Sequence, residues 1–260
     1  MATILFRRSF DHEGEFEVAR KYFNIVERRN QCPPGELIIG RYSVLPYHDE
    51  LEKDLYDIGC KLINTTEQHN WVANFDYYDV LREYTAETWT DHDFYLSSHP
   101  GPFVVKGRTN SRKNNWASLM FAENRRRALE IASELMNDPL IGPQGVIYRK
   151  YEPLVKLQEG INGLPFTNEW RFFFYREHLL SHAFYWSQSD IQGTMTDDGV
   201  EFAMNIAKIA KESVNFFVLD IAEKQSGGWM LVEVNSGPMS GLSCNNPDVL
   251  YSNFAKILSS

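Results

Sequence analysis

Short apolar runs and longer amphipathic segments take turns along the first 85 residues of the chain. The apolar runs predict strands over residues 3–6, 36–40 and 60–64, and the segments between and after them predict helices over residues 13–29, 49–59 and 74–85. In the first helix one stripe of side chains at helical spacing is expected in the core: Phe16, Ala19, Tyr22, Phe23 and Val26. This alternation is typical of an α/β lobe.

The pattern changes between residues 85 and 101, which are polar and irregular and therefore form the best candidate for a domain boundary. A strand ending at Lys106 follows, then a polar loop, a helix over residues 124–136 and a strand that enters a hinge through Pro153. We expect three parts: an N-terminal α/β lobe over residues 1–88, a small lobe over residues 89–150 and a C-terminal lobe over residues 151–260.

The C-terminal lobe is predicted to follow the order β, β, α, β, β. Residues 168–186 read as a hairpin that turns near Arg176 and Glu177, and residues 199–213 read as an amphipathic helix. Two strand-like runs, NFFVLDIAE and GWMLVEVNSGP, then close the lobe and are joined by QSGG. The fold class is therefore α/β, built as α+β lobes.

These last two strands carry Asp220, Glu233 and Asn235. Because strand side chains alternate, Glu233 and Asn235 share a face, and a two-residue turn at Ser226 and Gly227 would place Asp220 opposite Glu233. Hard oxygen ligands of this kind suit Mg²⁺, whose remaining positions are commonly filled by nucleotide phosphates and water. Acidic residues at strand ends that bind nothing fit the spacing about as well, but their apolar context demands a positive partner.

Positive side chains occur in two other places. The strand that ends at Lys106 leads into a loop with Arg108, Arg112 and Lys113, which fits either phosphate contact or a solvated basic loop. No glycine-rich phosphate motif of the P-loop or dinucleotide-binding type occurs in the chain. Glu169 and Arg171, two apart on a predicted strand, share a face, and Arg171 suits either a phosphate group or an ordinary cross-strand ion pair.

Composition limits the classes of function. The net charge of −9 argues against general affinity for nucleic acid, although a local basic cleft could still bind phosphates. The cysteines Cys32, Cys60 and Cys244 are odd in number and contain no CxxC pair, and no apolar run approaches the roughly 18 residues of a membrane span. We expect a cytoplasmic protein.

Together these segments resemble the ATP-grasp superfamily. The resemblance rests on PFVVK, on the hinge strand VIYRKYEPL, on EWRFFF, and on FVLD followed by LVEVNSGP, and it covers residues 85–260. Within the superfamily the chain is most similar to the RimK-like and phage-associated branches, whose phosphate-binding set contains arginines as well as lysine. One departure is that the loop after Lys106, GRTNSRKNNW, has a single glycine where many members are glycine-rich.

The resemblance implies an ATP-grasp fold preceded by an N-terminal α/β lobe, and an ATP-dependent ligase with ATP and Mg²⁺ as cofactors. A carboxylate would be activated as an acyl phosphate and then joined to an amine, these two compounds and ATP being the partners. Arg171 and Lys106 would be catalytic, with Asp220, Glu233 and Asn235 as metal ligands and Ser236 and Gly237 bordering the substrate. The implied nucleotide-binding set is Lys106, Lys113, Arg149, Lys150, Tyr151 and Glu169.

Two alternatives stay open at this level: a phosphotransferase of the same fold, and an ATP-binding protein without catalysis that acts through partners. Trp71, Tyr77 and Tyr78 are candidate surface aromatics for the second alternative, but burial trends favour the core for them. Arg7, Arg8 and Arg41, near predicted strand ends, suit either a substrate carboxylate or the protein surface.

Overall fold

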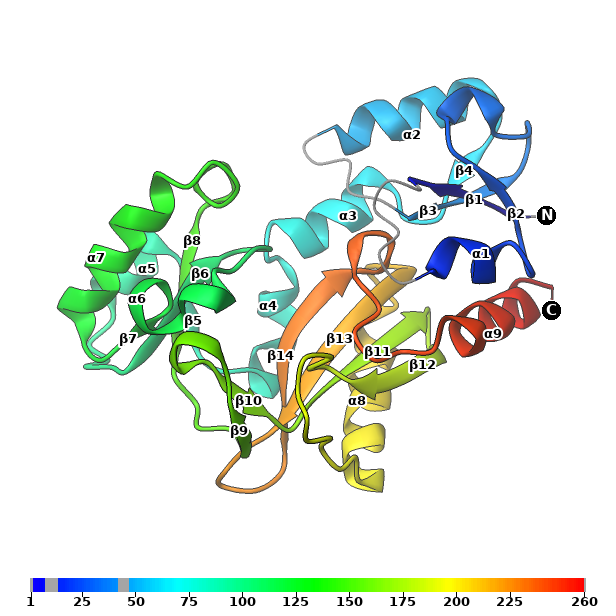
Figure 1. The fold of residues 1–260 in the computed structure, drawn as a ribbon. Helices are drawn as coiled ribbons and strands as arrows, with labels where there is room; N and C mark the ends of the chain where they lie inside the picture. The colour runs from blue at the N-terminus through cyan, green and yellow to red at the C-terminus, as the bar shows by residue number, and fades with distance from the viewer. Residues whose placement is uncertain (1, 8–13, 42–46, 260) are drawn as a thin grey trace.

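The computed structural model describes residues 2–7, 14–41 and 47–259 of the chain. Within these ranges the strands form three four-stranded sheets and one two-stranded sheet. Figure 1 shows that the sheet of strands β11–β14 is central, with the green small lobe on one side of it and the blue N-terminal sheet and red helix α9 on the other. The predicted α/β class is confirmed.

The N-terminal sheet is parallel, with the strand order β2-β1-β3-β4. Its strands are β1 (Ala2–Phe6), β2 (Asn24–Val26), β3 (Leu37–Arg41) and β4 (Lys61–Leu62). The accompanying helices are α1 (Glu15–Ala19), η2 (Arg29–Gln31), α2 (His48–Asp57), α3 (Thr66–Ala73), α4 (Tyr77–Leu81) and η3 (Arg82–Tyr84).

The helix predicted over residues 13–29 is wrong in its second half. Among the described residues, helix α1 ends at Ala19, and Asn24–Val26 form strand β2, which pairs with β1. The β-branched Ile25 and Val26 fit a sheet better than a helix, and the Asn24 amide donates to the Thr3 hydroxyl at 3.0 Å. The expected core role of the stripe is confirmed, because its members are buried or pack against buried clusters.

The small lobe has the strand order β5-β8-β6-β7. Its strands are β5 (Thr88–Trp89), β6 (Phe103–Gly107), β7 (Phe121–Ala122) and β8 (Val146–Lys150). Its helices are α5 (Asp91–Leu96), η4 (Lys113–Asn115), α6 (Trp116–Leu119), α7 (Arg125–Met136) and η5 (Gly142–Gln144).

The segment expected to be irregular, residues 85–101, contains both β5 and α5. These elements are too short to show a period, and they exist because of contacts made elsewhere. Strand β5 pairs with β8, and the buried ring of Phe94 on α5 stacks on Tyr148 with centroids 3.9 Å apart. Tertiary packing therefore stabilises a segment whose own sequence is polar.

The central sheet is antiparallel, with the order β12-β11-β13-β14, and the predicted β, β, α, β, β order is confirmed. A two-stranded sheet, β9 with β10, precedes it. The elements are β9 (Lys156–Glu159), η6 (Ile161–Gly163), β10 (Pro165–Thr167), β11 (Glu169–Tyr175), β12 (His178–Phe184), α8 (Asp197–Ala210), β13 (Phe216–Glu223), β14 (Trp229–Ser236), η7 (Gly237–Met239) and α9 (Pro247–Ser259).

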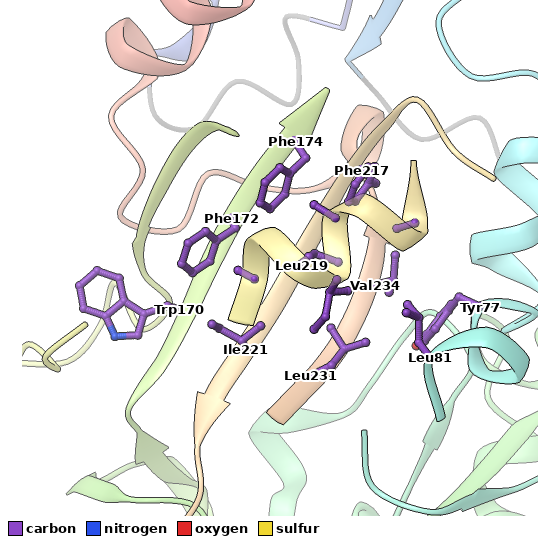
Figure 2. Packing of buried hydrophobic residues seen from close by; sticks show 14 of the residues in the cluster. Tyr77, Leu81, Trp170, Phe172, Phe174, Phe217, Leu219, Ile221, Leu231 and Val234 are labelled. Carbon is purple, nitrogen blue, oxygen red and sulfur yellow. The ribbon is translucent and has the colours of Figure 1, made fainter. Parts of the chain in front are cut away.

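The two faces of the central sheet bury different partners. One face is apolar along its length: Trp170, Phe172 and Phe174 follow one another on β11 and belong to one buried cluster, and Figure 2 shows Phe172 and Phe174 beside helix α8. The same cluster includes Tyr77 on α4, while Trp71 and Tyr78 pack against it, so these aromatics belong to the core.

The opposite face is divided. Phe173 and Val218 on this face pack against the N-terminal sheet and Phe254 of helix α9. Farther along the same strands, this face carries Glu169, Arg171 and Asp220 instead. The N-terminal lobe thus covers one half of the face and leaves the polar half next to the small lobe. No helix in the described part of the chain is long and apolar enough to span a membrane.

Candidate active site

Three neighbouring strands bring the predicted site residues into one row. Arg171 on β11 pairs with Asp220 on β13, and Asp220 pairs with Glu233 on β14. Cross-strand partners point to the same face, so the three side chains lie side by side. The predicted placement of Asp220 opposite Glu233 is confirmed.

The prediction that a two-residue turn at Ser226 and Gly227 produces this pairing is wrong. Strands β13 and β14 are joined by five residues, 224–228, with Gly227 and Gly228 at φ of 95° and 73°. Such a loop alone would set the register one residue away. A register shift between Asp220 and Ile221 leaves Val232 as an extra residue on β14 and restores the pairing with Glu233.

Asp220 lies at the bottom of the row with only 1% of its side chain exposed. Arg171 donates to both of its oxygens, from Nε to Oδ1 and from Nη2 to Oδ2, each at 2.8 Å. The Asn235 amide donates to Oδ2 at 3.0 Å. Burial lowers the pKa of Arg171, but the charge of Asp220 more than offsets this and raises it, so the guanidinium stays charged.

Glu233 is surrounded by a surplus of positive charge. Lys106 on β6 forms a buried ion pair with it across the lobes. Burial would raise the pKa of Glu233, but Lys106, Lys113 and Arg149 lower it overall. Burial also lowers the pKa of Lys106, helped by the like charges of Arg149 and Lys113 against the attraction of Glu233. The lowered pKa of Glu233, despite its burial, reflects the positive charges around it.

Lys113 reaches the site from the loop of residues 108–115. Its Nζ donates to the Tyr185 hydroxyl at 2.6 Å and lies 3.9 Å from Oε1 of Glu169. Burial raises the pKa of Glu169 to about 7, against the opposing charge of Lys113. Another cation of the same loop, Arg112, instead forms an ion pair with Asp138 of the small lobe.

Two cavities meet along this row. The first, about 490 Å³, lies between the small lobe and the central sheet, and its lining includes Lys106, Lys113, Glu169 and Glu233. Its walls are otherwise largely apolar, with Val104, Met120, Leu154 and Val232. The second, about 360 Å³, is lined by the loop residues 109–115 together with Arg171, Tyr185, Glu233 and Asn235. Lys113 and Glu233 border both cavities.

The three predicted hinge residues occupy different positions. The amide N–H groups of Lys150 and Tyr151 donate to the carbonyls of Glu87 and Pro102, at 2.8 and 3.0 Å. The Arg149 side chain turns away from the hinge, donating to the Thr88 hydroxyl and the Val232 carbonyl. Arg149 therefore ties strand β8 to the bulge beside Glu233.

Of the three N-terminal arginines, Arg41 is held entirely by groups of the protein itself. Arg41 is buried, and its guanidinium is held by both oxygens of Glu15 and by the carbonyls of Gly237 and Ser240. Neither reading from the sequence, a substrate contact or a surface charge, matches this position. Arg8 lies outside the described residues.

Two residues of the site were missed by reasoning from sequence. Tyr185 and Trp186 follow strand β12, and both rings lie within cation–π distance of Lys113. The only local signal is the aromatic run at residues 184–186, which reads as the end of a core strand. Their role depends on Lys113, which lies 72 residues from Tyr185 in the chain, and no local pattern specifies such a contact.

Solved structures of similar fold are ATP-grasp proteins. The ATP-grasp ligase PsnB, complexed with minimal precursor, Mg and ADP, has a TM-score of 0.61 and 8% identity, covering 100% of this chain and 98% of that one. The RimK domain protein ATP-grasp from Sphaerobacter thermophilus has a TM-score of 0.61 and 13% identity, covering 100% and 99%. D-alanyl-alanine synthetase A from Vibrio cholerae O1 biovar eltor has a TM-score of 0.57 and 14% identity, covering 99% and 95%.

The family is shown by sequence. A search of curated protein sequences finds no significant match. The family model of the ATP-grasp domain, R-2-K clade, family 3, matches residues 95–254, and the chain belongs to this family. The resemblance to the ATP-grasp superfamily and to its branch with arginines in the phosphate-binding set is confirmed, as is the prediction of an ATP-grasp enzyme.

Proposed function

We propose that this protein is an ATP-dependent carboxylate-amine ligase, which activates a carboxylate as an acyl phosphate and transfers the acyl group to an amine. The observation that carries the proposal is the junction of the two cavities, where Lys113 and Glu233 border both. A nucleotide in the first cavity would present its terminal phosphate to an acid in the second. Family membership supports the same reading.

The first cavity fits ATP in size and chemistry. Its volume of about 490 Å³ suits a small cofactor, and its apolar walls suit a purine. The hinge residues Glu152, Pro153 and Leu154 line it and would border the base, while the Lys150 and Tyr151 amides are already bonded. Oε1 of Glu169 is buried without a hydrogen-bond partner, as expected of a group that awaits a ligand.

Mg²⁺ fits the oxygens of Asp220, Glu233 and Asn235. No group of three or more His, Cys, Asp or Glu gathers among the described residues, but Mg²⁺ commonly needs only one or two carboxylates beside phosphate and water. Bound Mg-ATP would supply the phosphoryl group and offset its charge. A metal would share Glu233 with Lys106 and Asp220 with Arg171.

The chain's own residues would act by position and charge. Lys106 would hold ATP phosphates, and Lys113 and Arg171 would neutralise the phosphoryl group as it passes to the acid. The loop 108–115 would exclude water, which protects an acyl phosphate from hydrolysis. No protein nucleophile is needed, because positioning and electrostatic stabilisation account for most of the catalysis of phosphoryl transfer.

ADP release tests the reaction. PsnB was solved with a precursor peptide, and a second neighbour is a D-alanyl-alanine synthetase, so peptides and amino acids are the first acids and amines to screen. We expect ADP release that requires both an acid and an amine. Release that needs only one acceptor and yields a stable phosphorylated product would instead indicate a phosphotransferase.

Nucleotide binding tests the site independently of the substrates. Calorimetry should show Mg-ATP binding to the wild type and its loss in the double variant Glu233→Ala, Asn235→Ala. The exposed Glu134→Ala on helix α7 is the control and should bind as the wild type does. A folded wild type that binds no Mg-ATP would overturn the proposal.

A further inference from the structure

Tyr185 occupies a position between two cations that come from different lobes. It is the first residue after strand β12, and its amide donates to the Glu169 carbonyl at 2.9 Å, which fixes its backbone to β11. Its side chain is half-buried and lines the second cavity beside Arg171 and Glu233.

On the small-lobe side, Tyr185 holds Lys113. The ammonium donates to the phenol oxygen at 2.6 Å and lies 4.1 Å from the ring centroid. The Trp186 ring is 5.1 Å away, and Oε1 of Glu169 is 3.9 Å away. A lysine carried by an irregular loop is thus enclosed by three residues of the central sheet region.

On the large-lobe side, the same ring contacts Arg171, whose Cζ lies 4.8 Å from the ring centroid. Burial raises the pKa of the Tyr185 phenol, with the charge of Lys113 opposing, so the phenol stays neutral and accepts from the ammonium. One aromatic ring therefore attracts two like charges and holds both beside the second cavity.

The loop that carries Lys113 has few other ties to the large lobe. Asn162 donates to the Asn114 carbonyl at 2.6 Å. Arg112 and Thr109 instead bond to Asp138 and Gln144, which belong to the small lobe. The Lys113 contact is therefore a principal connection between the loop and the central sheet in the described chain.

We propose that Tyr185 is a positioning residue, which fixes Lys113 and Arg171 at the junction of the two cavities and holds the loop 108–115 closed over it. The proposal rests on the proposed function for the roles of Lys113 and Arg171. Tyr185 would not contact the reacting atoms. The Tyr185 hydroxyl would hold Lys113, and the Tyr185 ring would hold both Lys113 and Arg171.

Tyr185→Phe removes the hydroxyl and keeps the ring. Since a hydrogen bond to a charged group is lost, we expect Mg-ATP affinity to fall about tenfold with an unchanged melting temperature. Hydrogen exchange in residues 108–116 should become faster in the nucleotide-free protein. Tyr95→Phe is the matched control, because Tyr95 is 68% exposed on helix α5, and it should leave both measurements unchanged.

A double-mutant cycle separates positioning from general packing. In a Lys113→Met background, Tyr185→Phe should have no further effect on affinity, because its partner is gone. Additive losses in the cycle would overturn the role of Tyr185, and so would loop exchange and affinity like the wild type in Tyr185→Phe. If the wild type binds no Mg-ATP, the proposed function falls and the positioning role falls with it, whereas a failure confined to Tyr185→Phe leaves the proposed function intact.

Discussion

Two ion pairs of the site are buried on both sides. The side chains of Arg171 and Asp220 are 11% and 1% exposed, and those of Lys106 and Glu233 are 8% and 12% exposed. Removing one member of such a pair leaves an uncompensated charge in a desolvated place. Substitutions here therefore affect folding as well as chemistry, and the two effects must be measured separately.

Arg171→Met should lower the free energy of unfolding by about 3 kcal/mol, because Asp220 remains buried without its guanidinium. Urea denaturation measures this loss. Adding Asp220→Asn should restore part of it, since the orphaned charge is then removed. Arg126→Met on helix α7 is the control, because the Arg126 side chain is 87% exposed, and a loss as large there would contradict the explanation.

Helices α2 and α3 meet through two stacked imidazoles. The rings of His48 and His69 are 4.2 Å apart and nearly parallel, and both residues are buried. Burial, with a further contribution from His48, lowers the pKa of His69 to about 4, and burial likewise lowers the pKa of His48. Both imidazoles are therefore neutral in the folded protein at neutral pH.

Because the folded pKa of His69 lies below its ordinary value, the unfolded chain binds more protons between pH 6.5 and about 4. Stability should therefore fall as the pH drops through this window, by on the order of 2 kcal/mol from pH 7 to pH 5 for His69 alone. His69→Phe should remove this part of the pH dependence in urea titrations. The exposed His178→Gln should not, and an identical profile in both variants would count against the assignment.

The turn after Asn235 depends on the close approach of the Gly237 backbone to the Phe216 ring. A Cβ on Gly237 would lie 2.6 Å from the ring of Phe216, whereas a Cβ on Gly241 would meet nothing within 4 Å. Gly237→Ala should therefore destabilise the protein by about 1–3 kcal/mol and displace η7, while Gly241→Ala should be nearly neutral. Thermal denaturation of the two variants gives the comparison, and equal melting temperatures would refute it.

Elements with a strong period could be predicted from the sequence, and elements made by contact could not. Helices α7 and α8 and strands β11 and β13 follow from their own patterns. Strand β2 and helix α5 do not, because pairing with β1 and packing on Tyr148 decide them. The same division holds for the site. Asp220, Glu233 and Asn235 lie on two consecutive strands, so their proximity could be predicted from the local sequence, whereas the roles of Tyr185 and Arg149 depend on partners distant in the sequence.

The whole chain has a net charge of −9, but the charge around the site is positive. Lys106, Lys113, Arg149 and Arg171 surround Glu233 and Asp220 between the lobes. The field at the site therefore differs in sign from that of the whole chain. An anionic nucleotide would be held there by local charge and shape.

Because the first cavity is lined by both lobes, a nucleotide bound there should stabilise the whole molecule. At a concentration of Mg-ATP 100 times its dissociation constant, the stabilisation is about 2.7 kcal/mol, or a rise in melting temperature of roughly 5–10 °C. Differential scanning calorimetry checks this, with Mg²⁺ alone as the control. An equal rise in the Glu233→Ala, Asn235→Ala variant would place binding elsewhere.

The row Arg171, Asp220, Glu233 joins strands that a ribosome makes at different times. Arg171 is synthesised 49 residues before Asp220 and 62 before Glu233. The apolar face of the N-terminal sheet that packs on Phe216 and Phe254 is likewise covered only after those residues have been made. A nascent chain that stops between Arg171 and Asp220 carries a guanidinium with no buried counter-charge to receive it. Synthesis must therefore pass Asp220 and Glu233 before the row can form, and a chain truncated earlier cannot assemble it.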